Sequence, residues 1–261
     1  MFLRFNDRIS CGGMLVIGRD LLYDTDMDKY KELWPGGALY AGDPVGADSL
    51  ALADFAGKIK AARICDLGCG CGILLLLLGR GRESTELRGV ELRTAAAEQA
   101  RRNARANGMA DRCRIVTGDL RAVPFPAESA ELVISNPPYF PAGAGGISPD
   151  PDRALMRSET ADLGQLCAAA AKLLTPGGAF CLVHRTERMA EVFRALSAAG
   201  LEPRRLRLMA AGPKSPPWAF LCEARKGAGP GLAVEPTLLQ RGEDGRETRE
   251  YLQICHWEEQ A

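Results

Sequence analysis

The feature that most constrains the fold is a regular alternation of strand-like and helix-like segments, which begins near residue 62. Apolar, strand-like stretches lie at 62–65, 87–90, 113–117, 132–135 and 179–183, and helical stretches fall between most of them. The clearest helix is predicted over 163–174, where leucine, cysteine and alanine recur with a period of 3.6 residues. Such alternation is typical of an α/β fold, a doubly wound and mostly parallel sheet with helices on both faces.

Beyond residue 211 the alternation is lost. Strand-like runs at 218–223 and 248–255 flank a connection rich in glycine and proline, which predicts an antiparallel hairpin at the C-terminal end of a seven-stranded sheet. The first part of the chain mixes short apolar runs with glycine and proline, and a helix follows with Asp48 or Ser49 as its N-cap. We therefore expect a small N-terminal extension over 1–58, with short strands and a helix, and the main domain over 59–261.

Composition excludes several classes of protein. The chain has 33 Lys and Arg against 33 Asp and Glu, so it is not broadly basic, although a local basic patch remains compatible with this balance. Nine cysteines is an odd number, several lie within apolar runs, and no secretory signal precedes them, which favours free thiols in the cytoplasm. The longest apolar run, 73–78, is far shorter than the ~20 residues of a membrane span.

A glycine-rich loop connects the first strand of the alternation to a helix. Gly68, Gly70 and Gly72 alternate with other residues directly after Asp66, and the helical run 73–78 follows. Glycine permits a tight turn and the close approach of a ligand. Cys65, Cys69 and Cys71 crowd the same segment, but their spacing does not suit structural zinc, so we expect packing and no metal.

Acidic residues end the next two strands. Glu91 lies 25 residues after Asp66, near the offset at which a carboxylate meets ribose hydroxyls in dinucleotide-binding folds, and Asp119 follows the third strand. NAD and S-adenosylmethionine (SAM) both fit a glycine-rich loop with a ribose carboxylate. Asp66 would repel a pyrophosphate but suits an ammonium and a sulfonium, so electrostatics favours SAM.

The segment Asn136, Pro137, Pro138, Tyr139 follows the strand 132–135 and carries the chemistry. Two prolines end the strand, and the simplest alternative is that they do nothing else. An amine conjugated to a purine or an acyl group is a poor nucleophile, because its lone pair is delocalised. The Asn136 amide oxygen and the Pro137 carbonyl can accept its two N–H groups, and Tyr139 can stack on a planar target. Positioning then promotes methyl transfer without a strong base.

Asp66 with its three glycines resembles the first motif of the Rossmann-like class I SAM-dependent methyltransferases. The segment from Asn136 to Tyr139 resembles the motif of the N-methyltransferases that act on exocyclic amines of nucleobases or on glutamine amides. The resemblance implies catalytic roles for Asn136, Pro137 and Tyr139. It implies cofactor binding, with S-adenosylhomocysteine as product, by the following residues: Asp48, Asp66, Gly68, Cys69, Gly70, Glu91, Leu92, Asp119, Leu120 and Asn136.

Over most of its length the chain is similar to the tRNA(Val) adenine-N6-methyltransferase family. The similarity rests on the segments 46–55, 136–140, 157–159, 173–178, 183–188, 223–227 and 243–251. It implies methylation of the N6 amine of an adenine beside the anticodon, with tRNA as the partner. Apart from this resemblance, we expect no membrane partner and a monomer. The alternatives are methylation of a release-factor glutamine or of guanine N2 in rRNA, and a non-catalytic SAM-binding protein that grips RNA.

An RNA substrate requires cations for its phosphates. Two groups of basic residues are candidates, although a solvated helix face is an equal alternative for each. His184 is more typical of a buried core histidine than of a catalyst. The first group spans 185–214, with seven basic residues against three acidic ones; the second consists of Arg101, Arg102 and Arg105.

Overall fold

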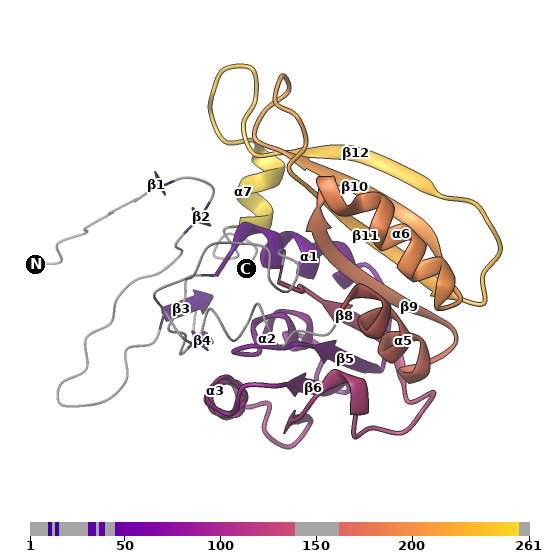
Figure 1. Cartoon of the computed structure of the whole chain (residues 1–261). Coiled ribbons are helices and arrows are strands. Elements are labelled where there is room, and N and C mark those ends of the chain that lie inside the picture. The colour runs from indigo at the N-terminus through magenta and orange to yellow at the C-terminus, as the bar shows by residue number, and fades with distance from the viewer. Residues whose placement is uncertain are drawn as a thin grey trace, which may run out of the picture.

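An eight-stranded sheet forms the centre of the molecule (Figure 1). The computed structural model describes residues 45–138 and 162–255, and the short segments 10–11, 14–15, 31–34 and 37–39. Across the sheet the strands are β12 (Ala233–Leu239), β10 (Leu201–Ala210), β11 (Ala219–Lys226), β9 (Leu174–Arg185), β8 (Ala130–Ser135), β5 (Arg63–Leu67), β6 (Glu86–Glu91) and β7 (Cys113–Thr117). Two small antiparallel pairs precede it, β1 (Ser10–Cys11) with β2 (Met14–Leu15) and β3 (Lys31–Trp34) with β4 (Gly37–Leu39).

The order and direction of the strands confirm the predicted α/β class. The strands β7, β6, β5, β8 and β9 are parallel, and β11 is antiparallel to both β9 and β10. The sheet has eight strands where seven were expected, because the run 248–255 is not a strand whereas two stretches that were not predicted, β10 and β12, are. The C-terminal antiparallel hairpin consists of β10 and β11, not of 218–223 with 248–255.

The segment 248–255 is a helix, α7 (Arg249–Cys255), where a strand was predicted. The Thr248 hydroxyl accepts from the Tyr251 amide at 3.1 Å, which is the hydrogen bond of an N-terminal cap. The buried residues Tyr251, Ile254 and Cys255 follow helical spacing. In a run of seven residues, helical and strand periodicity are hard to distinguish by sequence alone.

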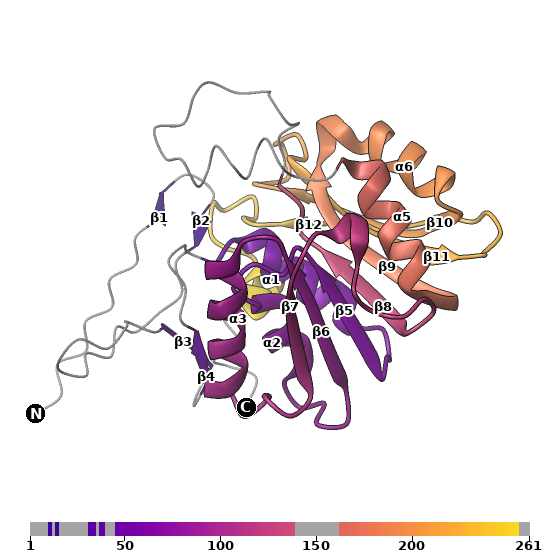
Figure 2. The ribbon, with the colours of Figure 1, turned by 60° about the horizontal axis from the view of Figure 1, so that its bottom comes forward.

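Helices cover both faces of the sheet, as Figure 2 shows. One buried cluster joins the sheet to α1 (Ala47–Gly57), α2 (Ile73–Gly79), α3 (Thr94–Ala106) and α7. A second cluster lies on the other face beneath α5 (Leu163–Leu173) and α6 (Met189–Ala198). Two 3-10 turns, Leu120–Ala122 and Thr186–Arg188, follow β7 and β9. The predicted helix over 163–174 is thus confirmed as α5, with Asp162 as its N-cap.

The helix α1 is part of the core, since Leu50, Leu52 and Phe55 are buried. It begins at Ala47 with Gly46 at the N-cap, so the prediction of Asp48 or Ser49 as N-cap was wrong. The Asp48 carboxylate instead accepts from the Ser49 amide within the first turn, at 2.8 Å. The boundary at residue 58 stays a prediction.

The carboxyl ends of the five parallel strands meet at one edge of the sheet, called here the C-terminal rim. Because β11 runs antiparallel between β9 and β10, the ends of β10 and β12 also lie on this rim. A hydrogen bond from the Ser135 hydroxyl to the Leu67 carbonyl, 2.7 Å long, joins the ends of β8 and β5 there. Ligands of open α/β sheets bind at such a rim. In the described part of the chain, the helices are too short or too polar to cross a membrane.

Candidate active site

The glycine-rich loop has the left-handed backbone that its sequence predicts. Gly68, Gly70 and Gly72 have φ angles of 79°, 53° and 84°, a region that residues with a Cβ rarely adopt. The Val90 carbonyl at the end of β6 accepts from the amides of Gly68 and Cys69, at 2.8 and 3.1 Å. The loop is therefore fixed against β6 at the C-terminal rim.

Asp66 stands directly before this loop as a buried carboxylate. It is 1% exposed, and neither of its oxygens has a hydrogen-bond partner among the described residues. Burial, and secondarily the nearby Glu91, raise its pKa well above the ordinary value. A buried carboxylate without a partner is costly, and a cationic ligand group would relieve that cost.

Glu91 lies beside the loop, as its position at the end of β6 predicts. One of its oxygens accepts from the Gly70 amide at 2.9 Å, and the other from the Arg93 amide at 3.0 Å. Leu92, the next residue, is 41% exposed, which is unusual for a large apolar side chain in this structure. Glu91 and Leu92 together offer a carboxylate and an apolar surface at the rim.

A backbone hydrogen bond brings the segment of Asp119 beside Glu91: the amide of Gly118, the residue before Asp119, donates to the Glu91 carbonyl at 2.9 Å. Its carboxylate accepts from the side chain and the amide of Arg121, which lowers its pKa. Asp119 thereby caps the turn that carries Leu120, a half-buried residue packed on the core. The structure brings the predicted residues of three successive strand ends to one place.

Asn136 follows β8 on the same rim. Its Nδ2 donates to the Ser49 hydroxyl at 2.9 Å, and Ser49 is 9% exposed in the first turn of α1. Sequence reasoning considered Ser49 only as a helix cap and missed this contact. The signal that could have found it is a polar side chain in the first turn of an otherwise apolar helix.

Two predicted site residues, Cys69 and Tyr139, are not seen to offer a side chain to a ligand. The Cys69 side chain packs towards β6, since a Cβ at Gly89 would come within 2.8 Å of its sulfur, so Cys69 would meet a ligand through its backbone. Burial raises the pKa of this thiol. Pro137 is half-buried, whereas Tyr139 lies outside the described residues, so its stacking role stays a prediction. The role of Asp48 towards the cofactor also stays a prediction.

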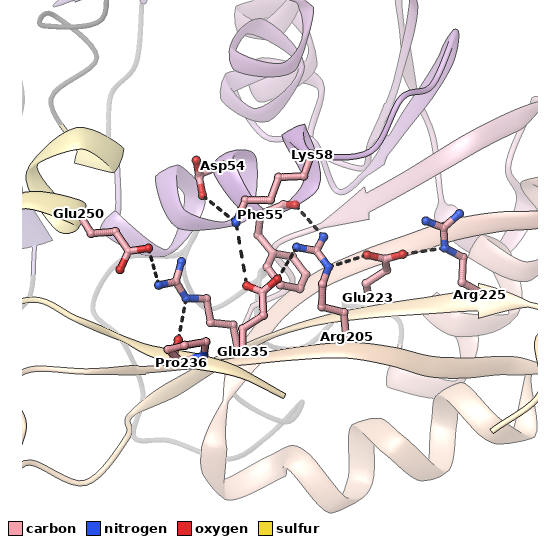
Figure 3. Close-up of polar contacts among 10 residues, drawn as sticks. Asp54, Phe55, Lys58, Arg205, Glu223, Arg225, Glu235, Pro236 and Glu250 are labelled. Atoms are coloured by element: carbon pink, nitrogen blue, oxygen red, sulfur yellow. Dashed lines mark hydrogen bonds and ion pairs between the residues drawn. The ribbon is translucent and has the colours of Figure 1, made fainter. Parts of the chain in front are cut away.

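Two arginines of the expected RNA-binding group are instead internal structural residues (Figure 3). The Arg205 guanidinium donates to Glu223 at 2.8 Å, to Glu235 at 3.0 Å and to the Phe55 carbonyl at 2.8 Å. Arg207 is 5% exposed and donates to Glu250 at 2.6 Å. These contacts join α1, α7 and three strands, so these two cations are engaged within the protein.

The second basic group is partly internal as well. Arg101 donates to the Ile115 carbonyl at 3.1 Å and to the Thr117 hydroxyl at 3.0 Å, which ties α3 to β7.

His184 is fully buried, its Nδ1 accepts from the Arg185 amide at 2.8 Å, and burial lowers its pKa to about 4. It has the character of the core histidine that was expected.

The described residues contain no cluster of three or more His, Cys, Asp or Glu side chains that could hold a metal ion. The eight cysteines from Cys65 to Cys255, all in the described part of the chain, are free thiols.

Comparisons with known proteins identify the family. The model of the methyltransferase small domain matches residues 37–199. A tRNA1(Val) (adenine(37)-N6)-methyltransferase of Tolumonas auensis is 36% identical over 215 residues, 81% of this chain and 87% of the relative. The chain belongs to this methyltransferase family.

Other relatives of the methyltransferase are matched over a shorter stretch. The enzyme of the same name from Cronobacter sakazakii is 39% identical, over 53% of this chain and 57% of that protein. A 4-amino-L-phenylalanine/4-methylamino-L-phenylalanine methyltransferase of Streptomyces pristinaespiralis is 39% identical, over 54% of this chain and 49% of its own. These two alignments span about half of each relative.

The fold has counterparts among solved structures. The crystal structure of a predicted O-methyltransferase from Agrobacterium tumefaciens superposes with a TM-score of 0.65 at 21% identity, covering 80% of this chain and 95% of that one. This likeness supports the fold alone.

The residues at the rim fit SAM, the cofactor of this methyltransferase. Asp66 offers an unpartnered buried carboxylate to an ammonium group, the loop amides and Glu91 lie where ribose hydroxyls would bind, and Leu92 offers an apolar surface to a purine. Membership of the methyltransferase family confirms the predicted cofactor, while the individual residue assignments remain proposals.

Proposed function

We propose that this methyltransferase transfers a methyl group from SAM to the N6 amine of an adenine in tRNA, at position 37 beside the anticodon. The observation that carries the proposal is Asn136, held by Ser49 on the same rim as the unpartnered Asp66 carboxylate. The target, adenine 37 of a tRNA, is inferred from the names of the relatives, and the hydrogen-bond acceptors of the site suit an amine of this kind.

The orientation of the Asn136 amide explains how an unreactive amine can be presented. Its Nδ2 is engaged by Ser49, so Oδ1 is the end that accepts an N–H of the substrate. The Pro137 carbonyl accepts the second N–H. With both hydrogens held, the nitrogen lone pair is directed out of the plane of the base, and positioning replaces a strong base. Bound SAM supplies the electrophilic methyl group.

His184, the only histidine of the described residues, is not suited to act as a general base. His184 is buried and its pKa is lowered to about 4 by burial, so it is neutral near pH 7 and its Nδ1 is occupied by the Arg185 amide. The proton lost from the methylated amine can pass to water after transfer, because an aryl ammonium is strongly acidic. The site therefore needs hydrogen-bond acceptors to position the amine, and water can take the proton that is released.

The relatives favour tRNA over other amine substrates. The Tolumonas enzyme, named for tRNA, aligns over 87% of its length, whereas the amino-phenylalanine enzyme aligns over 49%. An adenine and an aminophenyl ring both carry an amine conjugated to an aromatic system, the class of nucleophile that Asn136 and Pro137 suit. We place the enzyme in the cytoplasm, where its tRNA substrate and reduced thiols belong.

The test is an acceptor screen with methyl-labelled SAM. The acceptors are total tRNA, rRNA, a release factor and 4-amino-L-phenylalanine, each digested or chromatographed to identify the labelled product. We expect label in N6-methyladenosine from tRNA. Label in methylglutamine, N2-methylguanosine or methylaminophenylalanine would keep the fold and the cofactor but overturn the proposed substrate.

A further inference from the structure

A cavity of about 300 Å³ lies on the C-terminal rim, beyond the residues assigned to the cofactor and the amine. Ligand pockets begin at about this size. Met209, Leu238 and Tyr251 are among its lining residues and are almost fully buried, so they form an apolar floor. Arg185 and Trp218 also line it and are partly exposed, so they stand at its mouth.

The cavity is close to the site of methyl transfer. Ala47 lines it, and Ser49, two residues further along α1, holds Asn136. Side chains two residues apart lie on different sides of a helix, so the closer link is through the sheet: Arg185 ends β9, which pairs with β8, the strand that leads into Asn136. Asn136 itself is not among its lining residues, which separates the cavity from the target position.

Hydrogen bonds between loops of the rim fix the shape of the cavity. The Trp218 amide donates to the Met209 carbonyl at 2.9 Å, and the Thr186 hydroxyl donates to the Pro217 carbonyl at 2.7 Å. The Gln240 amide donates to the Ala210 carbonyl at 2.9 Å, which holds the end of β12 against β10. In Figure 1 the loops after β10 and β12 rise together beside α7. The cavity is therefore preformed.

The mouth of the cavity combines an aromatic ring with a cation. The Arg185 guanidinium carbon lies 5.6 Å from the centre of the Trp218 ring. Its ion pair with Glu187 is 3.7 Å long, and the Glu187 side chain is 67% exposed, so the pair is weak and exchangeable. Lys214 is exposed on the loop that ends at Trp218. By contrast, Arg205 of the same basic group is engaged by the buried Glu223 and the half-buried Glu235, and Arg207 is itself buried.

We propose that this cavity receives an unpaired base of the substrate RNA adjacent to the methylated adenine. The proposal rests on the proposed function. Trp218 stacks on that base, and Arg185 binds the phosphate that joins it to the target. A flat aromatic ring fits the apolar floor, and an aromatic side chain beside an arginine is the usual platform for single-stranded nucleotides. Holding the neighbour would also help to splay the target adenine out of its stack.

The experiment uses an anticodon stem-loop RNA in which the nucleotide on either side of the target adenine is made abasic. Affinity is measured by fluorescence anisotropy with S-adenosylhomocysteine present, for the wild type and for Trp218→Ala. On the side whose base occupies the cavity, we expect the abasic change to weaken the binding of RNA to the wild-type enzyme about 10- to 100-fold. The same change should have little effect in Trp218→Ala, and Trp218→Phe should behave like the wild type.

A second variant tests the phosphate contact. Arg185→Met should reduce the slope of log affinity against log salt by about 0.7 to 1. Arg63→Met is the matched control, since Arg63 begins β5 at the opposite edge of the sheet and pairs with Glu131 at 2.9 Å. This control should leave the slope unchanged.

The outcomes separate this proposal from the proposed function. Equal losses from the abasic change in the wild type and Trp218→Ala would overturn the cavity assignment, even if the RNA is methylated. Base-dependent binding that Trp218→Ala abolishes would support the cavity, even if no methyl group is transferred. Calorimetry with S-adenosylhomocysteine checks that each variant remains folded.

Discussion

The Nδ2 atom of Asn136 lies 2.9 Å from the hydroxyl oxygen of Ser49, although the two residues are 87 positions apart in the chain. This contact joins the end of β8 to the first turn of α1. It fixes the donor end of the amide, so the acceptor end is available to the substrate amine. If Asn136 presents the amine as proposed, α1, a helix that precedes the glycine-rich loop, contributes to the active site.

Replacing Ser49 by alanine should slow methyl transfer while sparing cofactor binding. The loss of one hydrogen bond, about 1 kcal/mol, corresponds to a rate about 5- to 10-fold lower. Single-turnover kinetics measures the rate, and calorimetry with S-adenosylhomocysteine measures the affinity. Ser197→Ala, an exposed serine of α6, is the matched control. A wild-type rate in Ser49→Ala would show that this contact does not orient the amide.

Replacing Asn136 by alanine should have a far larger effect on the rate. The substitution removes an acceptor of the amine hydrogens, so we expect at least about a 100-fold loss of turnover, as for other preorganised hydrogen-bonding groups. SAM affinity should stay within a few-fold, because Asp66, the loop and Glu91 are untouched. Undiminished turnover would remove Asn136 from the mechanism.

Asp66 should make SAM binding depend on pH. Its pKa is raised in the ligand-free protein, so below that pKa the carboxyl is protonated, whereas pairing with the ammonium of SAM favours the ionised form. Binding should therefore release a proton, and affinity should rise with pH until Asp66 is ionised. Calorimetry in two buffers with different ionisation enthalpies measures the proton, and identical enthalpies would contradict the assignment.

The same shift has a consequence for stability. Between the ordinary value of 3.8 and the raised pKa, the folded state binds more protons than the unfolded state, so the free energy of unfolding should fall as pH rises. Asp66→Asn should therefore flatten this pH dependence. It should raise thermal stability near pH 7 and weaken SAM binding.

Arg205 should matter for stability and not for RNA binding. Arg205→Met would leave Glu223, which is 6% exposed, with one cation fewer, and breaking a buried pair typically costs about 3–5 kcal/mol. Urea unfolding measures this loss, and Arg194→Met on the exposed face of α6 should change the free energy of unfolding by less than about 0.5 kcal/mol. Preserved stability together with weakened RNA affinity would instead assign Arg205 to phosphate binding.

The parallel core of the fold could be predicted because its strands are short apolar runs bounded by turns. The strand β10 escaped notice, since Pro203 and its arginines interrupt the apolar pattern that signals a strand. The edge strand β12 is mostly exposed and contains Pro236, so it has little apolar signal. Where tertiary contacts decide the structure, local pattern is insufficient.

The site was predictable to the extent that each residue follows the end of a strand. Asp66, Glu91, Asp119 and Asn136 could be placed together because parallel strands end at one edge. The contact of Ser49 could not, because it depends on how α1 packs. A count of basic residues also could not distinguish Arg205, which is bound by Glu223 and Glu235, from arginines that reach solvent. Such a count does not show which acidic residues each arginine pairs with in the fold.

The most direct test of the central claim uses tRNA1(Val) transcripts with adenine or guanine at position 37. Each is incubated with methyl-labelled SAM and either wild-type enzyme or Asn136→Ala, and the labelled nucleosides are identified. We predict N6-methyladenosine only from the adenine transcript with the wild-type enzyme. Equal labelling of the guanine transcript, or undiminished labelling by Asn136→Ala, would contradict the account of the target and of the residue that presents it.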